Sequence, residues 1–187
     1  QIMTEDDCLL LDLEPGESRI YISRIPEDEA SLPKPPKQRP VKRQELHGEI
    51  RLSAAFVQEK DTNNNFRPMG SLDSLTDLSM RDEFLDFHGI LRYEMDFSFH
   101  ADAQSTGKET IFLDGANEVV SLSVNGQKAL VRIGSPYRFE VGPFLKDGEN
   151  HLVIENITAV FPYVKDHPSI NTGLHPMGLC GKIWLES

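Results

Sequence analysis

The side chains best suited to bind a small ligand gather in one polar segment, residues 161–177. An aromatic ring can stack on the apolar face of a sugar, while amides, carboxylates and imidazoles can hydrogen-bond its hydroxyl groups. A long loop in a compact domain is often functional, although it can equally pack on an adjacent domain. The segment therefore predicts a carbohydrate site, with domain packing as the alternative. Its candidate residues are Tyr163, Asp166, His167, Asn171 and His175.

A sixth candidate for sugar binding is Trp184, the single tryptophan of the chain. It alternates with Ile183 and Leu185, so in a strand its ring would lie on the opposite, exposed face. An exposed indole could stack on a sugar, and it could equally cover an interface with another domain. Both interpretations remain open at this stage.

Two groups of residues carry atoms that can ligate metals. Asp114, Asn117 and Glu118 offer the oxygen ligands that suit calcium, so they form a candidate calcium site. His167, His175 and Cys180 are spaced more widely than the two to four residues typical of zinc ligands. The spacing therefore predicts no zinc site.

A pair of carboxylates that could act as acid and base occurs at Glu94 and Asp96, on one face of a probable strand. General acid catalysis needs a carboxyl group whose pKa is raised in a cleft, and a solvated strand face provides no such burial. The sequence contains neither a nucleophile elbow nor a phosphate-binding glycine loop. We therefore predict no catalytic residue in this chain and no enzyme activity of its own.

Strict alternation of apolar and polar residues dominates the chain from residue 44 onward. The clearest example is residues 91–100, where five apolar residues alternate with five polar ones, as in a strand with one buried face. Asn125 and Gly126 follow another such segment and form the strongest short hairpin signal, because both tolerate positive φ. The other positions expected to line strands are Ile50, Leu52, Ala54, Phe56, Val120, Leu122, Val124, Ala129, Val131, Ile133, Tyr137, Phe139, Val141, Leu152, Ile154, Ile183 and Leu185.

Short strands with turn signals every 8–12 residues or so indicate an all-β sandwich or barrel. We predict an antiparallel β-sandwich over residues 44–187. Within it, residues 70–86 have a partly helical spacing of leucines, which indicates a short helix or an ordered loop. Residues 1–25 predict a β-hairpin, which could be the tail of a preceding domain, and the five prolines of residues 26–43 predict an extended linker.

Composition limits the partners that the chain can have. The formal net charge is −11, which argues against nucleic acid or an anionic membrane as a partner because phosphates would repel the protein. No apolar run approaches the length of about 20 residues that spans a bilayer. The two cysteines, Cys8 and Cys180, could form a disulfide or remain free thiols. A glycosylation sequon at Asn156 falls at a probable strand end and receives little weight.

Five short motifs in order resemble the sugar-binding jelly-roll domain of glycoside hydrolases. Residues 88–93 resemble its G-x-x-x-Y strand, and residues 111–126 its L-x-L-G…V-x-V-N-G hairpin. Residues 136–141, 145–154 and 178–185 are similar to P-F-x-F-D-V, L-K-x-G-x-N-x-L-x-V and G-L-x-G-x-V-x-L. This galactose-binding-like sandwich is found at the N-terminus of family 2 enzymes and at the C-terminus of family 106 α-L-rhamnosidase-like enzymes. The motif at residues 14–18 resembles L-x-P-G-E-S and favours the second comparison.

The resemblance implies a galactose-binding-like jelly roll, often with a structural calcium, in an extracellular or periplasmic enzyme. The catalytic carboxylates of those enzymes lie in a barrel domain outside this chain, so no catalytic residue carries over. The implied role is to support the catalytic domain, through contacts with adjacent domains, or to bind a glycan. Three alternatives stay open: a stand-alone carbohydrate-binding module, a structural or protein-interaction sandwich without sugar affinity, and a free-standing hydrolase.

Overall fold

The computed structural model of the chain describes residues 42–56, 65–84, 87–101, 107–158 and 176–187. It also describes the backbone pairing of two short strands, β1 (Thr4–Glu5) and β2 (Cys8–Leu9), which run antiparallel. The linker predicted at residues 26–43, apart from its last two residues, and most of the predicted hairpin lie outside the described residues.

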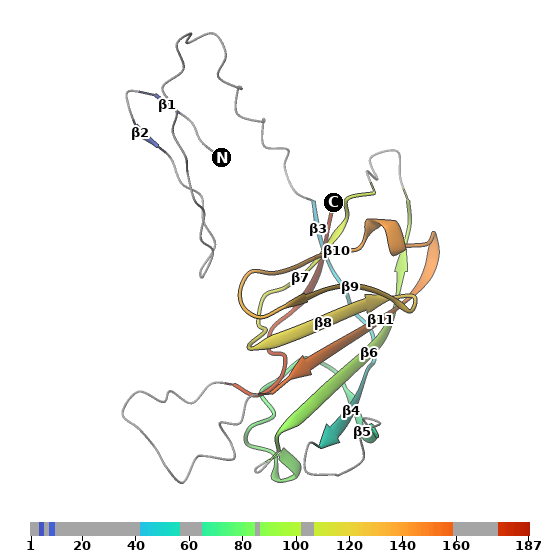
Figure 1. Cartoon of the computed structure of the whole chain (residues 1–187). Coiled ribbons are helices and arrows are strands. Elements are labelled where there is room, and N and C mark those ends of the chain that lie inside the picture. The colour runs from blue at the N-terminus through green and yellow to red at the C-terminus, as the bar shows by residue number, and fades with distance from the viewer. Residues whose placement is uncertain are drawn as a thin grey trace.

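The main body consists of two antiparallel sheets (Figure 1). The six-stranded sheet has the order β5 (Arg67–Leu72), β4 (Ile50–Phe56), β6 (Gly89–Phe99), β11 (Gly148–Ile157), β8 (Val119–Val124) and β9 (Gln127–Arg132). The four-stranded sheet has the order β10 (Tyr137–Glu140), β7 (Thr110–Leu113), β12 (Ile183–Glu186) and β3 (Arg43–Glu45). The prediction of an all-β antiparallel sandwich is confirmed.

Alternation explains why these segments form strands and which face each one buries. In β6, Leu91, Tyr93, Met95 and Phe97 are buried while the residues between them face outward. In β8, Leu122 and its neighbours at 120 and 124 are likewise buried. Because side chains alternate across a strand, each sheet buries one face against the other and exposes the second face.

The core between the sheets is continuous. β11 lies at the centre of the large sheet, with ten residues paired to β6 on one side and six to β8 on the other. The largest fully buried side chains are Tyr93, Phe84, Phe87, Phe139, Leu78, Leu91, Ile111, Leu122, Leu152, Ile154, Leu179 and Glu109. Residues 70–86, for which a short helix or ordered loop was predicted, contain the end of β5 and the 3-10 helix η2 (Asp82–Phe84), which places Phe84 in this core.

The β8–β9 hairpin confirms the predicted Asn-Gly turn. Asn125 has φ 52° and Gly126 has φ 78°, and Val124 pairs directly with Gln127 across the two-residue loop. Ala129 and Val131 lie on the returning strand as predicted, whereas Ile133 follows its last residue, Arg132. Val131 is 46% exposed and Ile133 is 82% exposed, because β9 is the edge of its sheet and its register shifts opposite Ser121 and Ser123.

Two buried asparagines join neighbouring segments rather than serve as surface groups. Asn150 is 2% exposed and its side chain bonds Asn125, Lys146 and Gly148. Asn156 is also 2% exposed and donates to the Asn117 carbonyl oxygen at 2.8 Å. A side chain this deeply buried cannot accept a glycan, so Asn156 acts as a structural residue despite its sequon.

Three further features complete the described part of the chain. Cys180 is a free, half-buried thiol, and burial raises its pKa. Another 3-10 helix, η3 (Gly142–Phe144), connects β10 to the turn before β11. Within the described ranges, no helix has the length and apolar character required to cross a bilayer.

Candidate functional site

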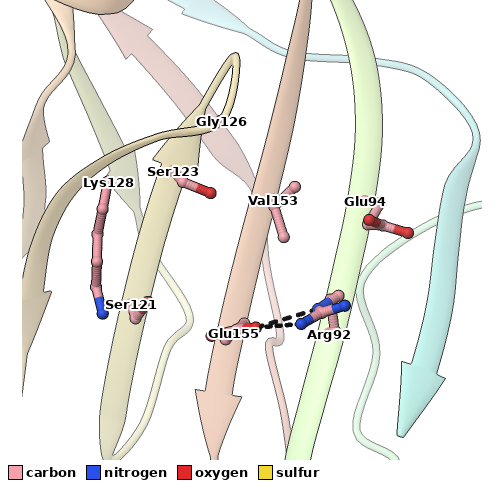
Figure 2. Close-up of a pocket in the computed structure, with 8 residues that line it drawn as sticks. All are labelled: Arg92, Glu94, Ser121, Ser123, Gly126, Lys128, Val153 and Glu155. Atoms are coloured by element: carbon pink, nitrogen blue, oxygen red, sulfur yellow. Dashed lines mark hydrogen bonds and ion pairs between the residues drawn. The ribbon is translucent and has the colours of Figure 1, made fainter. Parts of the chain in front are cut away.

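A shallow hollow of about 320 Å³ lies on the outer face of the six-stranded sheet (Figure 2). Four neighbouring strands contribute to it: β6, β11, β8 and β9. Side chains that point away from the core line the hollow, so they are free to contact a ligand without disturbing core packing. The lining residues are Arg92, Glu94, Ser121, Ser123, Gly126, Lys128, Val153 and Glu155.

Strand register arranges these side chains in two rows across the sheet. In the first row Glu94 pairs with Val153, Val153 with Ser123, and Ser123 with Lys128. In the second row Glu155 lies between Arg92 and Ser121. Neighbouring strands are about 4.8 Å apart, so three spacings place the backbones of Glu94 and Lys128 about 14 Å apart. The carboxylate and the ammonium group therefore lie at opposite sides of the hollow.

An ion pair fixes the arginine of the second row. Arg92 donates from Nε and Nη2 to the same oxygen of Glu155, Oε1, at 3.1 and 2.7 Å. The ring of Phe66 lies against the guanidinium group, with its centroid 3.4 Å from Cζ. This stacking and the double hydrogen bond hold Arg92 in one orientation, while Oε2 of Glu155 accepts none of the hydrogen bonds found among the described residues.

A separate group of charges borders the hollow on the same face. Asp96 accepts a hydrogen bond from His151 Nδ1 at 2.7 Å and one from Arg51 Nη2 at 3.1 Å. These partners, the His151 bond first, hold the pKa of Asp96 below its usual range. A general acid needs the opposite shift, so the geometry gives Asp96 no acid role beside Glu94.

Most of the residues predicted to bind sugar lie outside the described part of the chain. Tyr163, Asp166, His167, Asn171 and His175 belong to that group, and their assignment stays a prediction. Trp184 is described: it is half-buried on the outer face of the four-stranded sheet, the layer opposite the hollow. Its Nε1 donates to Asp114 Oδ2 at 3.0 Å, and Lys182 Nζ lies 5.4 Å from the ring centroid.

Two of the three candidate calcium ligands, Asp114 and Asn117, make side-chain hydrogen bonds to other residues. Asp114 accepts from the Lys182 backbone N–H at 2.5 Å and from Trp184. The side chain of Asn117 donates to the carbonyl of Pro176 at 3.4 Å, and the Glu118 carbonyl oxygen accepts from the Tyr137 hydroxyl at 2.7 Å. No cluster of three or more His, Cys, Asp or Glu side chains in the described ranges is arranged to hold a metal. The assignment of a calcium site to these residues stays a prediction.

The sequence pattern predicts most of the strands that line the hollow, but it does not predict the hollow itself. Alternation shows that Arg92, Glu94, Ser121, Ser123 and Glu155 face outward. It does not show that β11 lies between β6 and β8, which is what brings these residues together. The only sequence signal is the presence of outward serines in two successive polar positions of β8.

Comparison with known proteins was informative only at the level of structure. No known protein family matches the chain, and no curated protein matches it by sequence. A rhamnosidase from Novosphingobium sp. PP1Y is similar with a TM-score of 0.63 and 18% identity, over 82% of this chain and 16% of that one. A β-glucuronidase from Ruminococcus gnavus is similar with a TM-score of 0.56 and 16% identity, over 82% of this chain and 30% of that one.

A third similar structure is an FMN-binding β-glucuronidase from Facaelibacterium prausnitzii L2-6, with a TM-score of 0.55 and 16% identity. The match covers 78% of this chain and 22% of that enzyme. The chain thus spans less than a third of the length of each of these glycoside hydrolases. The TM-scores show a shared fold, and identities this low show nothing beyond the fold. The sandwich described here thus also occurs as one part of larger glycoside hydrolases.

Proposed function

We propose that this chain is a non-catalytic accessory domain of a multidomain glycoside hydrolase, which supports the catalytic domain or binds glycan. The observation that carries the proposal is the structural match, in which about four-fifths of this chain corresponds to a small part of each enzyme. The five ordered motifs that resemble sugar-binding jelly rolls support it independently. In this role the domain makes and breaks no bond, and it acts through binding and interdomain packing. We extend the proposal to an extracellular or periplasmic location.

Two assays on the 187-residue chain test this proposal together. Hydrolysis of p-nitrophenyl α-L-rhamnoside and p-nitrophenyl β-D-glucuronide should not exceed the buffer rate. Calorimetry against a panel of plant and host glycans, with calcium and then with a chelator, should give weak saturable heats if the domain binds glycan directly. Turnover that disappears when a carboxylate is mutated would contradict the non-catalytic assignment, and loss of binding with the chelator would support a calcium site.

A structural or protein-interaction role without sugar affinity is the second candidate. It is favoured by the apolar side chains exposed at and just beyond the edge strand β9: Leu130 is 49% exposed, Val131 46% and Ile133 82%. Exposed apolar residues on a sheet edge favour pairing with another surface. This role predicts no heat with any glycan and a change in association state on mutating Ile133→Lys. Light scattering of the two proteins measures the association state directly.

A further inference from the structure

The outer-face hollow contains several polar groups that have no partner among the described residues. The ammonium group of Lys128 and the hydroxyl groups of Ser121 and Ser123 make no hydrogen bond or ion pair with any described residue. Among the described residues, the basic side chain recorded beside the Glu94 carboxylate is that of His151, whose Nε2 lies 3.9 Å from Oε1, beyond hydrogen-bond range. The hollow therefore presents one cationic donor, one anionic acceptor and the Ser123 hydroxyl to the solvent side, while Ser121 is only 9% exposed.

Charge balance indicates which ligands these groups could hold. Arg92 and Lys128 carry positive charges while Glu94 and Glu155 carry negative ones, so the formal charge of the lining is zero. The lining has no excess positive charge to attract an anionic ligand, and the protein as a whole has a net charge of −11. A neutral ligand with many hydroxyl groups suits this lining, because each hydroxyl can donate to a carboxylate and accept from an ammonium group or guanidinium.

The centre of the hollow is apolar and the hollow is small. Val153 occupies the middle of the first row, and Gly126 contributes no side chain to the adjacent wall. A pyranose presents C–H groups on its ring faces and hydroxyls around its edge, which matches an apolar centre with polar groups around it. The volume of about 320 Å³ lies at the lower end of the range of about 300–1,000 Å³ typical of small-molecule sites.

We propose that this hollow, lined by β6, β11, β8 and β9, binds a neutral mono- or disaccharide unit of a glycan. Glu94, Lys128 and Ser123 hydrogen-bond its hydroxyls, and Val153 contacts a ring face. The inference rests on the proposed glycan role and assigns it to the outer face of the large sheet rather than to the loop at residues 161–177. The lining includes no aromatic side chain, so we expect a dissociation constant in the millimolar range, about 1–20 mM.

The site can be located by amide chemical shifts of the ¹⁵N-labelled 187-residue chain. Lactose, cellobiose and L-rhamnose, each titrated to about 50 mM, serve as neutral probes, and sodium glucuronate serves as the anionic probe. We expect saturable shifts at Ser121, Ser123, Gly126, Lys128 and Val153 with at least one neutral probe. The shifts with glucuronate should be smaller at equal concentration.

Matched variants separate binding from folding. Lys128→Ala removes one charged donor, which should weaken the neutral probe about tenfold. Lys146→Ala removes an equally exposed lysine outside the hollow and should leave the affinity unchanged. Ser123→Ala has its control in Ser98→Ala, an outward serine on β6 whose partner is Glu149. Neither lysine variant nor Ser123→Ala should change the urea midpoint, because none of these side chains is in the core, whereas Ser98→Ala, which loses its bond to Glu149, should unfold at a slightly lower urea concentration.

Each result decides between the inference and the wider proposal. Shifts confined to residues 159–175 would overturn the inference and leave the glycan role intact at the site predicted from sequence. Stronger binding of glucuronate than of the neutral probes would overturn the assigned ligand class. The absence of shifts with every probe would overturn the inference, while the calorimetric panel of larger glycans would still decide the wider role.

Discussion

Asn150 should be among the most costly polar residues of the sandwich to remove. Its Oδ1 accepts from Asn125 Nδ2 and from the Lys146 backbone N–H, both at 2.8 Å. Its Nδ2 donates to the carbonyl oxygens of Lys146 at 2.8 Å and Gly148 at 2.9 Å. One side chain therefore joins the β8–β9 turn to the turn that starts β11. We expect Asn150→Ala to destabilise both turns together.

The magnitude follows from these four bonds. At a net contribution of about 1 kcal/mol each, their loss would cost about 4 kcal/mol. Lys146 is exposed, so water can replace part of what its backbone loses, and the expected loss of unfolding free energy is about 2–3 kcal/mol. Asn117→Ala is a matched control: among the described residues that side chain makes a single long hydrogen bond of 3.4 Å, so its loss should cost less than about 0.5 kcal/mol.

Urea unfolding followed by Trp184 fluorescence measures both variants. The slope of free energy against urea should stay constant, since the same surface is exposed on unfolding. If Asn150→Ala and Asn117→Ala lose equal stability at equal slope, the four-bond network cannot be what stabilises these turns, and the reasoning above is refuted.

Three further predictions concern backbone packing and pH. Gly115→Ala should cost at least about 2–3 kcal/mol in urea unfolding, because its Cβ would lie 1.3 Å from the Cys180 carbonyl oxygen, whereas Gly134→Ala, with open space around it, should cost much less. Burial raises the pKa of Tyr93 and of Tyr137, so the stabilisation that depends on their neutral phenols is fully present below pH 10 and is lost as pH rises further. Tyr93→Phe should therefore lose less unfolding free energy than the wild type above pH 10, and an equal loss in the variant would contradict this prediction. The His151 and Arg51 bonds lower the pKa of Asp96, so the stabilisation that its carboxylate gives the fold is fully present above about pH 4 and is lost below that pH. The difference in unfolding free energy between wild type and Asp96→Asn should therefore narrow from pH 6 to pH 3, and a constant difference would contradict this prediction.

Local pattern was enough to predict the central strands. In β6 the alternation at Leu91, Tyr93 and Met95 predicts both the strand and its buried face. Successive side chains of a strand point to opposite faces, so only one orientation of the strand places all three apolar side chains in the core. The Asn125–Gly126 turn was predictable for a similar local reason, since few residue pairs tolerate two positive φ values.

Features that depend on strand order were not predictable. Val131 has the same apolar character as Val120, yet Val120 is fully buried and Val131 is half exposed. The difference is that β8 lies inside the sheet while β9 forms its edge, and nothing in either segment encodes that position. Asn150 looks like an ordinary turn residue until the turn packs against Asn125. The hollow has the same origin, since it exists only because β11 lies between β6 and β8.

Three of the four strands that line the hollow, β6, β11 and β8, lie inside the sheet, so most of its lining has a rigid base. Arg92 lies between Leu91 and Tyr93, which are at most 2% exposed, and Ser123 follows the fully buried Leu122. Core packing therefore fixes the backbone beneath each outward side chain, and a ligand would order few additional torsions on binding. Since the outward residues contribute little to the core, substitutions among them should alter ligand choice without a matching stability cost. A face of this kind can therefore diverge while the sandwich persists.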